Sequence, residues 1–143
     1  IMVVDDYGHH PVEIRAVLRA VRDGWQKRSV IVFQPHRYTR TKDLFDDFLS
    51  AFNDAEKLII TEVYPAGEEK IEGYGGEDLY KGIREHGHKD IAFVPDLDSI
   101  AGYLKEVVKA GDMVLTLGAG NVWKVGMELL EELSGEEQNA EGA

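Results

Sequence analysis

Short runs of branched apolar residues alternate with longer amphipathic segments along this chain, and this alternation limits the fold more than any other feature. The amphipathic segments place apolar residues three or four positions apart, which is the spacing of one helix face. The apolar runs are continuous, which is typical of strands buried on both faces of a parallel sheet. We predict strands at residues 2–4, 30–33, 58–61, 91–94 and 113–117, each followed by an amphipathic helix.

A strand and a helix repeated in this way predict an α/β fold. Crossovers between parallel strands are right-handed, so the chain can cover both faces of the sheet by winding in two directions. We therefore expect a Rossmann-like, doubly wound, mostly parallel sheet of about five or six strands with helices on both faces. A short extra strand at Lys70-Ile71-Glu72 would be the sixth. We assign residues 1–133 to this domain and expect residues 134–143 to form a disordered acidic tail, because that segment is rich in small and acidic residues.

The composition excludes several classes of function. With 27 acidic and 16 basic residues the net charge is −11, which argues against a nucleic-acid binder. No apolar run approaches the roughly 20 residues of a membrane helix, so we expect no membrane partner. The chain has no cysteine, which fits a cytoplasmic location. It opens directly on a strand without a starting methionine, so we expect it to be a piece of a longer polypeptide.

The segment Phe33–Thr41 (FQPHRYTRT) joins the second predicted strand to a helix. In open α/β sheets, loops at the carboxyl ends of strands bind ligands. Arg37 and Arg40 each offer a planar fork of donors that stays charged, and with His36 they suit a small carboxylate or phosphate. The alternative is that both arginines are ordinary solvated loop charges.

The first predicted strand ends in Asp6-Tyr7-Gly8-His9-His10-Pro11. A carboxylate at this place, Asp6, can accept hydrogen bonds from ribose hydroxyls, and the ring of Tyr7 can stack on a base or a sugar. The neighbouring residues His9 and His10 cannot both face one ion in an extended chain, where side chains alternate. We therefore predict no metal site in this domain.

The last predicted strand ends in Gly118-Ala119-Gly120-Asn121. This segment has two glycines of the dinucleotide-binding fingerprint, but Trp123 stands where the third is required. What remains is either a tight turn without a ligand or a close-approach turn at a helix N-terminus that favours an anion or a polar group. The chain has no G-x-x-x-x-G-K-[ST] phosphate loop, so a triphosphate must be held elsewhere.

Together these motifs resemble the C-terminal domain of the Mur ligases, the ATP-dependent amide ligases of peptidoglycan synthesis. The resemblance spans residues 1–133. The segment with the two arginines is most similar to that of the member that adds L-alanine to UDP-N-acetylmuramate. The ligases that recycle murein peptides share the first motif but not the H-R-Y-[ST]-R loop. The matching segments are DYGHHP at 6–11, FQPHRYTRT at 33–41, TEVYPAGE at 61–68 and LGAGN at 117–121.

The resemblance implies a reaction in two stages. ATP phosphorylates the lactyl carboxylate of UDP-N-acetylmuramate, and the amine of L-alanine then attacks the acyl phosphate. It also implies two further domains in the same polypeptide: an N-terminal domain that binds the UDP-sugar and a central domain that holds Mg²⁺ and the phosphates. The present chain alone is therefore expected to be inactive.

The resemblance also implies roles for individual residues. Arg37 and Arg40 would hold the alanine carboxylate, with His36 and His9 beside them. The nucleotide would meet Asp6 and Tyr7, and the amino acid would be approached by Gly118, Gly120 and Asn121. Two alternatives stay open: the domain of a murein-peptide recycling ligase, and a non-catalytic module that binds an anion or a nucleotide.

Overall fold

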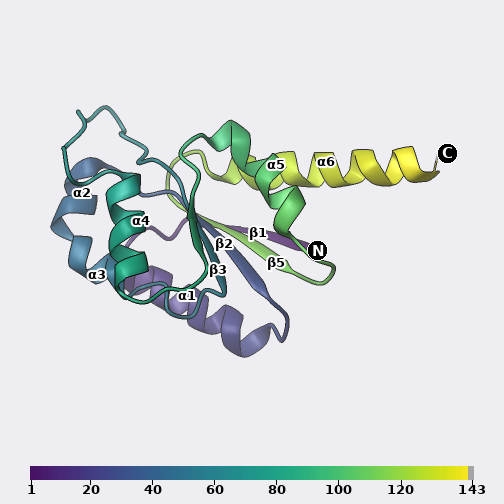
Figure 1. The fold of residues 1–143 in the computed structure, drawn as a ribbon, viewed down its shortest axis with the longest axis horizontal. Coiled ribbons are helices and arrows are strands. Elements are labelled where there is room, and N and C mark those ends of the chain that lie inside the picture. Colours follow the sequence, from purple (N-terminus) through teal and green to yellow (C-terminus); the bar gives the residue numbers. More distant parts are fainter. Residues whose placement is uncertain (142–143) are drawn as a thin grey trace.

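A five-stranded parallel sheet forms the centre of the computed structural model, which describes residues 1–141 and their side chains up to residue 135 (Figure 1). The strand order is β1-β5-β2-β3-β4. The predicted α/β fold with a parallel sheet is confirmed, and each predicted strand coincides with an observed one within two residues. The strands are β1 Met2–Asp6, β2 Ser29–Phe33, β3 Lys57–Ile60, β4 Ile91–Phe93 and β5 Met113–Leu117.

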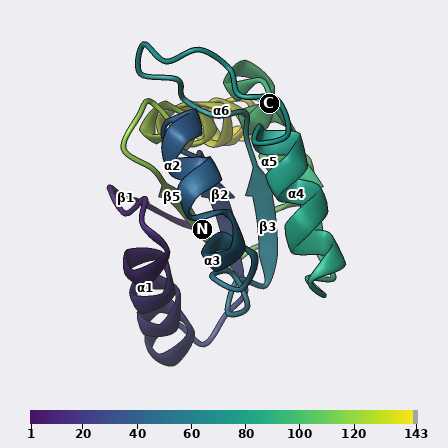
Figure 2. The ribbon, with the colours of Figure 1, turned by 90° about the vertical axis from the view of Figure 1, so that its left-hand side faces the viewer.

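Helices cover both faces of the sheet. Helices α1, α3 and α4 pack on one face, and α5 and α6 pack on the other (Figures 1 and 2). The short helix α2 leads into α3. The helices are α1 Pro11–Gly24, α2 Tyr38–Asp43, α3 Phe45–Leu49, α4 Gly76–Glu85, α5 Leu97–Val107 and α6 Trp123–Glu141. None of these helices is long and apolar enough to span a membrane.

The two central strands show why their sequences are continuously apolar. Every residue of β2 and β5 is buried, because successive side chains enter different cores. Ile31 and Phe33 pack with α1, α3 and α4, whereas Val30 and Val32 pack with α5 and α6. Alternation along a strand and helices on both faces thus explain the pattern.

The chain changes its winding direction at β5. This strand lies between β1 and β2, yet the helix that follows it packs on the opposite face from the helix that follows β1. At such a switch point the connections diverge from the carboxyl ends of neighbouring strands and leave a crevice for ligands. The motifs that end β1, β2 and β5 therefore meet at this place.

The prediction of a sixth strand at residues 70–72 is wrong. This segment has no regular structure and forms a turn, in which the backbone N–H of Tyr74 donates to the carbonyl of Ile71. It belongs to an irregular segment between β3 and α4. The surrounding glycines favour such turns, and they offer few side chains that could cover one face of a strand.

Two helix boundaries also differ from the prediction. Helix α2 begins at Tyr38, so Thr39 and Arg40 belong to its first turn and not to a loop. Helix α6 continues through Glu141, whereas the sequence predicted a disordered tail from residue 134. A helix can extend into a polar, glutamate-rich segment because its hydrogen bonds are satisfied within the segment itself. Residues 142–143 lie outside the described part of the chain.

Candidate functional site

The carboxyl ends of β1, β2 and β5 are joined by backbone hydrogen bonds just beyond the strands. The N–H of Gly118 donates to the carbonyl of Asp6 (3.1 Å), and the N–H of Gln34 donates to the carbonyl of Leu117 (3.0 Å). The structure therefore brings the first, second and last motifs of the sequence to one edge of the sheet. Their side chains can act on one ligand.

The arginine segment is tied to the segment that follows β3. Tyr64 N–H donates to the Pro35 carbonyl, and Arg37 N–H donates to the Tyr64 carbonyl, both at 2.8 Å. These bonds form an isolated parallel bridge between His36 and Tyr64. The bridge fixes the backbone immediately before Arg37, whose exposed side chain extends from the edge of the sheet.

Arg37 has an unusual backbone conformation, with φ of 69° and ψ of 139°. A side chain at positive φ is strained, and such strain occurs preferentially at functional sites. Here it is accompanied by contacts that hold the turn: the Arg37 carbonyl accepts hydrogen bonds from both the N–H and the hydroxyl of Thr41. The turn directs the chain from β2 into α2 and separates Arg37 from Arg40 by one short helical turn.

Arg40 is oriented by His36. Arg40 Nη1 lies 3.3 Å from His36 Nδ1. Arginine can only donate, so Nδ1 must be the unprotonated nitrogen and the ring proton must lie on Nε2. Burial, together with the positive charge of Arg40, lowers the pKa of His36. His36 is therefore neutral at pH 7 and can accept from the guanidinium.

Aromatic rings extend this cluster toward β1. The ring of His36 stacks on Tyr64 with centroids 5.5 Å apart. On the β1 side, the centroid of the His9 ring lies 5.8 Å from that of His36. The rings of His9 and Tyr7 are perpendicular, with centroids 5.6 Å apart. The predicted residues His9, His36 and Arg40 thus form one contact chain.

Glu68 supports the first turn of α2, a role that the sequence did not reveal. One of its carboxylate oxygens accepts from the Thr39 N–H (3.1 Å) and the other from the Thr39 hydroxyl (2.6 Å). The hydrogen bond from the hydroxyl lowers the pKa of Glu68. The carboxylate therefore stays ionised at the positive end of the helix, where it is stabilising.

The end of β1 provides Asp6 and Tyr7. One carboxylate oxygen of Asp6 accepts from the Gly8 N–H at 2.7 Å. This contact fixes the carboxylate and leaves its second oxygen for another donor. Tyr7 is 69% exposed, so a face of its ring is open to solvent.

The two neighbouring histidines, His9 and His10, make different contacts. His10 caps α1: its Nδ1 accepts from the Val12 N–H, and the Glu13 carboxylate accepts from the His10 N–H. His9 instead contacts Tyr7 and His36. Among residues 1–135, no group of three or more His, Cys, Asp and Glu side chains could hold a metal ion.

The turn after β5 needs both of its glycines. A Cβ on Gly118, which has φ of 156°, would lie 3.1 Å from the Gln34 carbonyl oxygen. A Cβ on Gly120 would lie 2.6 Å from Tyr64 Cγ and 2.7 Å from Gln34 Oε1. The turn thus packs directly against the residues that follow β2 and β3.

Gln34 connects this turn to β2, and sequence reasoning gave it no role. Gln34 is 3% exposed, and its side chain hydrogen-bonds to the Asn121 side chain and to the backbone directly before α6. A glutamine that directly follows the apolar run at residues 30–33 was the available signal. Its partner, however, lies 87 residues away, which no local pattern indicates.

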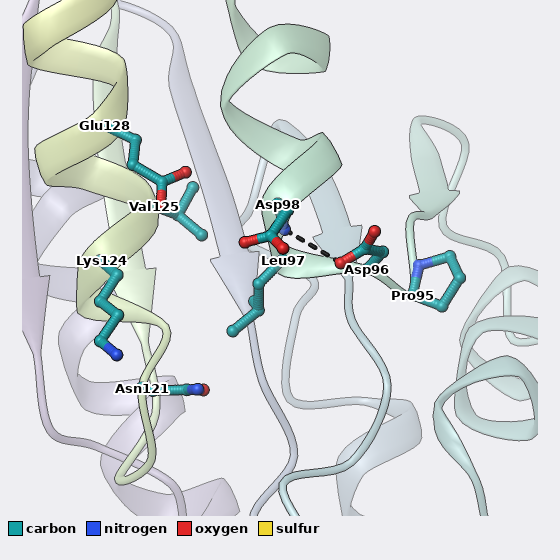
Figure 3. A pocket seen from close by; sticks show the side chains of 8 residues that line it. All are labelled: Pro95, Asp96, Leu97, Asp98, Asn121, Lys124, Val125 and Glu128. Carbon is teal, nitrogen blue, oxygen red and sulfur yellow. Dashed lines mark hydrogen bonds between the residues drawn. The ribbon is translucent and has the colours of Figure 1, made fainter.

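A pocket of about 340 Å³ opens beside Asn121 on the α5 and α6 side of the sheet. Figure 3 shows Asn121, Lys124 and Glu128 on its α6 side and the first turn of α5 on the other. Asp96 caps that turn by accepting from the Asp98 N–H. The lining residues are Pro95, Asp96, Leu97, Asp98, Asn121, Lys124, Val125 and Glu128.

Comparison with known proteins identifies relatives of the whole described domain. The UDP-N-acetylmuramate–L-alanine ligase of Geotalea uraniireducens is 55% identical over 136 residues, which are 95% of this chain and 30% of that protein. The ligase of the same name from Geotalea daltonii is 56% identical over 133 residues, covering 93% of this chain and 29% of that protein. The chain thus spans about 30% of the length of these relatives.

A solved structure of a ligase of the same kind is also similar to this chain. The UDP-N-acetylmuramate-alanine ligase of Thermotoga maritima superposes with a TM-score of 0.71 at 26% identity, over 94% of this chain and 27% of that one. The family model described as "Mur ligase, glutamate ligase domain" matches residues 1–120. Its match includes the ends of β1, β2, β3 and β5, which carry the candidate site. The chain therefore belongs to the Mur ligase family, and its residues 1–120 form the domain that this family model describes.

Proposed function

We propose that this chain is the C-terminal domain of an ATP-dependent ligase that joins L-alanine to UDP-N-acetylmuramate. The observation that carries the proposal is the set of cations at the switch point, where Arg37 and Arg40 extend from the β2 end, in a chain 55% identical to a ligase of that name. The N-terminal and central domains of the same polypeptide would supply the UDP-sugar site and the phosphate site. We also propose that this ligase acts in the cytoplasm.

In this function Arg37 and Arg40 hold the alanine carboxylate. Both guanidinium groups stay charged at working pH, and neutral His36 keeps Arg40 in place by accepting from it. Holding the carboxylate leaves the amine of alanine to face the acyl phosphate. Such positioning converts a bimolecular encounter into a reaction between oriented groups. His9, whose ring lies beside His36, closes the same side of the site.

The β1 end fits the sugar and base of ATP, which supplies the phosphoryl group. Asp6 has one carboxylate oxygen fixed by Gly8 and a second that can accept from a ribose hydroxyl. The exposed ring of Tyr7 can stack on the nucleotide. The described residues do not fit Mg²⁺, because they contain no cluster of metal-binding side chains. The metal and the triphosphate therefore belong to the central domain in this proposal.

The carboxylate-binding role can be tested by replacing Arg37 with alanine in the full-length protein. A charge-assisted hydrogen bond contributes about 1.5–3 kcal/mol, so Arg37→Ala should raise the KM for L-alanine about ten- to a hundredfold. The KM for ATP should change little, because Arg37 lies at the β2 end and the nucleotide residues lie at the β1 end. ADP release measured against each substrate in turn gives both constants.

Arg19→Ala is the matched control, because Arg19 is exposed on α1 away from the carboxyl ends of the strands. It should leave both constants unchanged. An unchanged KM for L-alanine in Arg37→Ala would refute the carboxylate clamp. Activity of the wild-type protein with a murein tripeptide but not with L-alanine would instead identify a recycling ligase.

A further inference from the structure

The side-chain amide of Gln34 is fixed by the backbone of another segment. Gln34 Oε1 lies 3.1 Å from the N of Asn121 and 3.2 Å from the N of Val122. Both N–H groups belong to the two residues directly before α6, where no preceding helical turn offers an acceptor. From its buried position directly after β2, Gln34 therefore caps the segment that leads into α6.

These contacts determine how the next amide is oriented. A backbone N–H can only donate, so the Gln34 atom facing Asn121 N and Val122 N must be the oxygen. The Gln34 nitrogen then faces the Asn121 side chain at 2.8 Å, and the atom there must be the acceptor Oδ1. The two hydrogens of Asn121 Nδ2 are consequently directed away from Gln34. No described residue accepts a hydrogen bond from them.

The free amide nitrogen of Asn121 borders the ligand edge. Asn121 lines the 340 Å³ pocket, and Figure 3 shows its side chain extending from the β5–α6 turn into the space between α5 and α6. Lys124, in the first turn of α6, lines the same pocket. The next residue toward the switch point, Gly120, packs against Tyr64 in the aromatic cluster.

We propose that Gln34 is a positioning residue that holds Asn121 with its amide nitrogen toward the substrates, where it donates to a carboxylate or phosphate oxygen. The inference rests on the proposed ligase function. An asparagine free to turn over would present Oδ1 half of the time, and that atom repels an anionic oxygen. Gln34 removes this choice, because only one orientation of Asn121 pairs with its Nε2 group.

Two nearly isosteric variants of the full-length protein test the proposal. Asn121→Asp keeps an acceptor for Gln34 Nε2 but has no donor for the substrate. Gln34→Glu still accepts from the two backbone N–H groups, which together with the α6 N-terminus favour the ionised carboxylate. Its second oxygen can pair only with a donor, so Asn121 must turn over and present Oδ1. Each variant should lower kcat/KM for L-alanine about tenfold or more, with the melting temperature of Asn121→Asp unchanged.

Two further variants control for charge. Asn121→Ala removes the donor without adding a charge and should show a similar loss. Asn53→Asp adds the same negative charge to an exposed asparagine at the opposite end of the sheet and should leave the kinetics unchanged. Wild-type kinetics in Asn121→Asp would overturn the donor role. If Gln34→Glu has wild-type kinetics and a lowered melting temperature, Gln34 stabilises the fold but does not position Asn121 for the reaction.

A readout without turnover tests the geometry independently. In the full-length protein labelled with ¹⁵N-asparagine, the Asn121 amide signals are those lost in Asn121→Asp. Their hydrogens should exchange rapidly with solvent in the wild type and slowly in Gln34→Glu, where they are bonded to the new carboxylate. Slow exchange in the wild type would overturn the inference. Absence of alanine-dependent ADP release from the wild type would instead refute the ligase function and leave this geometric result standing.

Discussion

At the scale of single residues, the most informative position combines a strained backbone with a charged side chain. Arg37 has φ of 69° and ψ of 139°, a region populated almost entirely by glycine. Glycine there would relieve the strain, yet the chain has an arginine. The sequence reveals the charge of this residue but not its strain, because the strain depends on the bridge between His36 and Tyr64, which lie in segments far apart along the chain.

The strain predicts an unusual order of stabilities. Arg37→Gly should be more stable than Arg37→Ala by about 1 kcal/mol, because glycine adopts this conformation without steric cost whereas alanine keeps its Cβ. Both variants lose the guanidinium, so both should lose affinity for L-alanine equally. Urea unfolding of the 143-residue chain measures the first effect, and KM in the full-length protein measures the second. Equal or reversed stabilities would show that the turn relaxes when the arginine is removed.

At the scale of elements, the sequence predicted the strands well and the connections poorly. The strands β2 and β5 were found because burial on both faces requires a continuous apolar run, which is a local property. The start of α2 was missed because Glu68, 29 positions away, accepts from the Thr39 N–H and hydroxyl. The coupling of the β5–α6 turn to Gln34 was missed for the same reason. Local patterns place the elements at the ligand edge, but contacts between distant segments set the geometry of the site.

The close packing of the β5–α6 turn gives a prediction at this scale. Gly120→Ala would place a Cβ 2.6 Å from Tyr64 Cγ and 2.7 Å from Gln34 Oε1, so the turn or the Tyr64 ring must shift. Overpacking of this kind costs about 1–3 kcal/mol. Because Tyr64 stacks on His36, which orients Arg40, the KM for L-alanine should also rise.

Gly102→Ala is the matched control for this variant. Gly102 lies in α5, and a Cβ there would meet nothing within 4 Å. In a helix interior, alanine is more stable than glycine by about 0.5–1 kcal/mol. The two substitutions should therefore shift the free energy of unfolding in opposite directions, and only the one at Gly120 should change the KM. A shift of the same sign in both variants would mean that the turn is not tightly packed.

At the scale of the whole molecule, the carboxyl and amino ends of the strands carry different groups of residues. The carboxyl ends of the strands carry exposed Arg37, part-buried Arg40, the histidines and the glycine turn. The amino edge contains a largely buried ion pair, in which Arg28 Nη2 lies 2.7 Å from Asp112 Oδ2. Arg28 also donates to the carbonyl of Val107 at the end of α5, and the N–H of Lys109 donates to Asp112. This cluster joins the starts of β2 and β5 to α5, and so it holds together the strands whose other ends form the site.

Breaking this ion pair should weaken the fold and spare the site. Asp112→Ala leaves the Arg28 guanidinium without its partner and should lower the free energy of unfolding by about 2–4 kcal/mol, with the KM for L-alanine unchanged.

Burial alone would raise the pKa of Asp112, but the hydrogen bonds from Arg28 and the Lys109 N–H outweigh it and lower that pKa. The stabilisation is therefore complete above the unfolded-state pKa of about 3.8 and is lost as the pH falls through the lower folded-state value. Urea unfolding between pH 7 and pH 2 should show the stability difference between wild type and Asp112→Ala constant at neutral pH and shrinking below about pH 4. Asp43→Ala, at an exposed position of α2, should show no such difference. A gap that persists unchanged at pH 2 would mean that Asp112 stabilises the fold by packing and not by its charge.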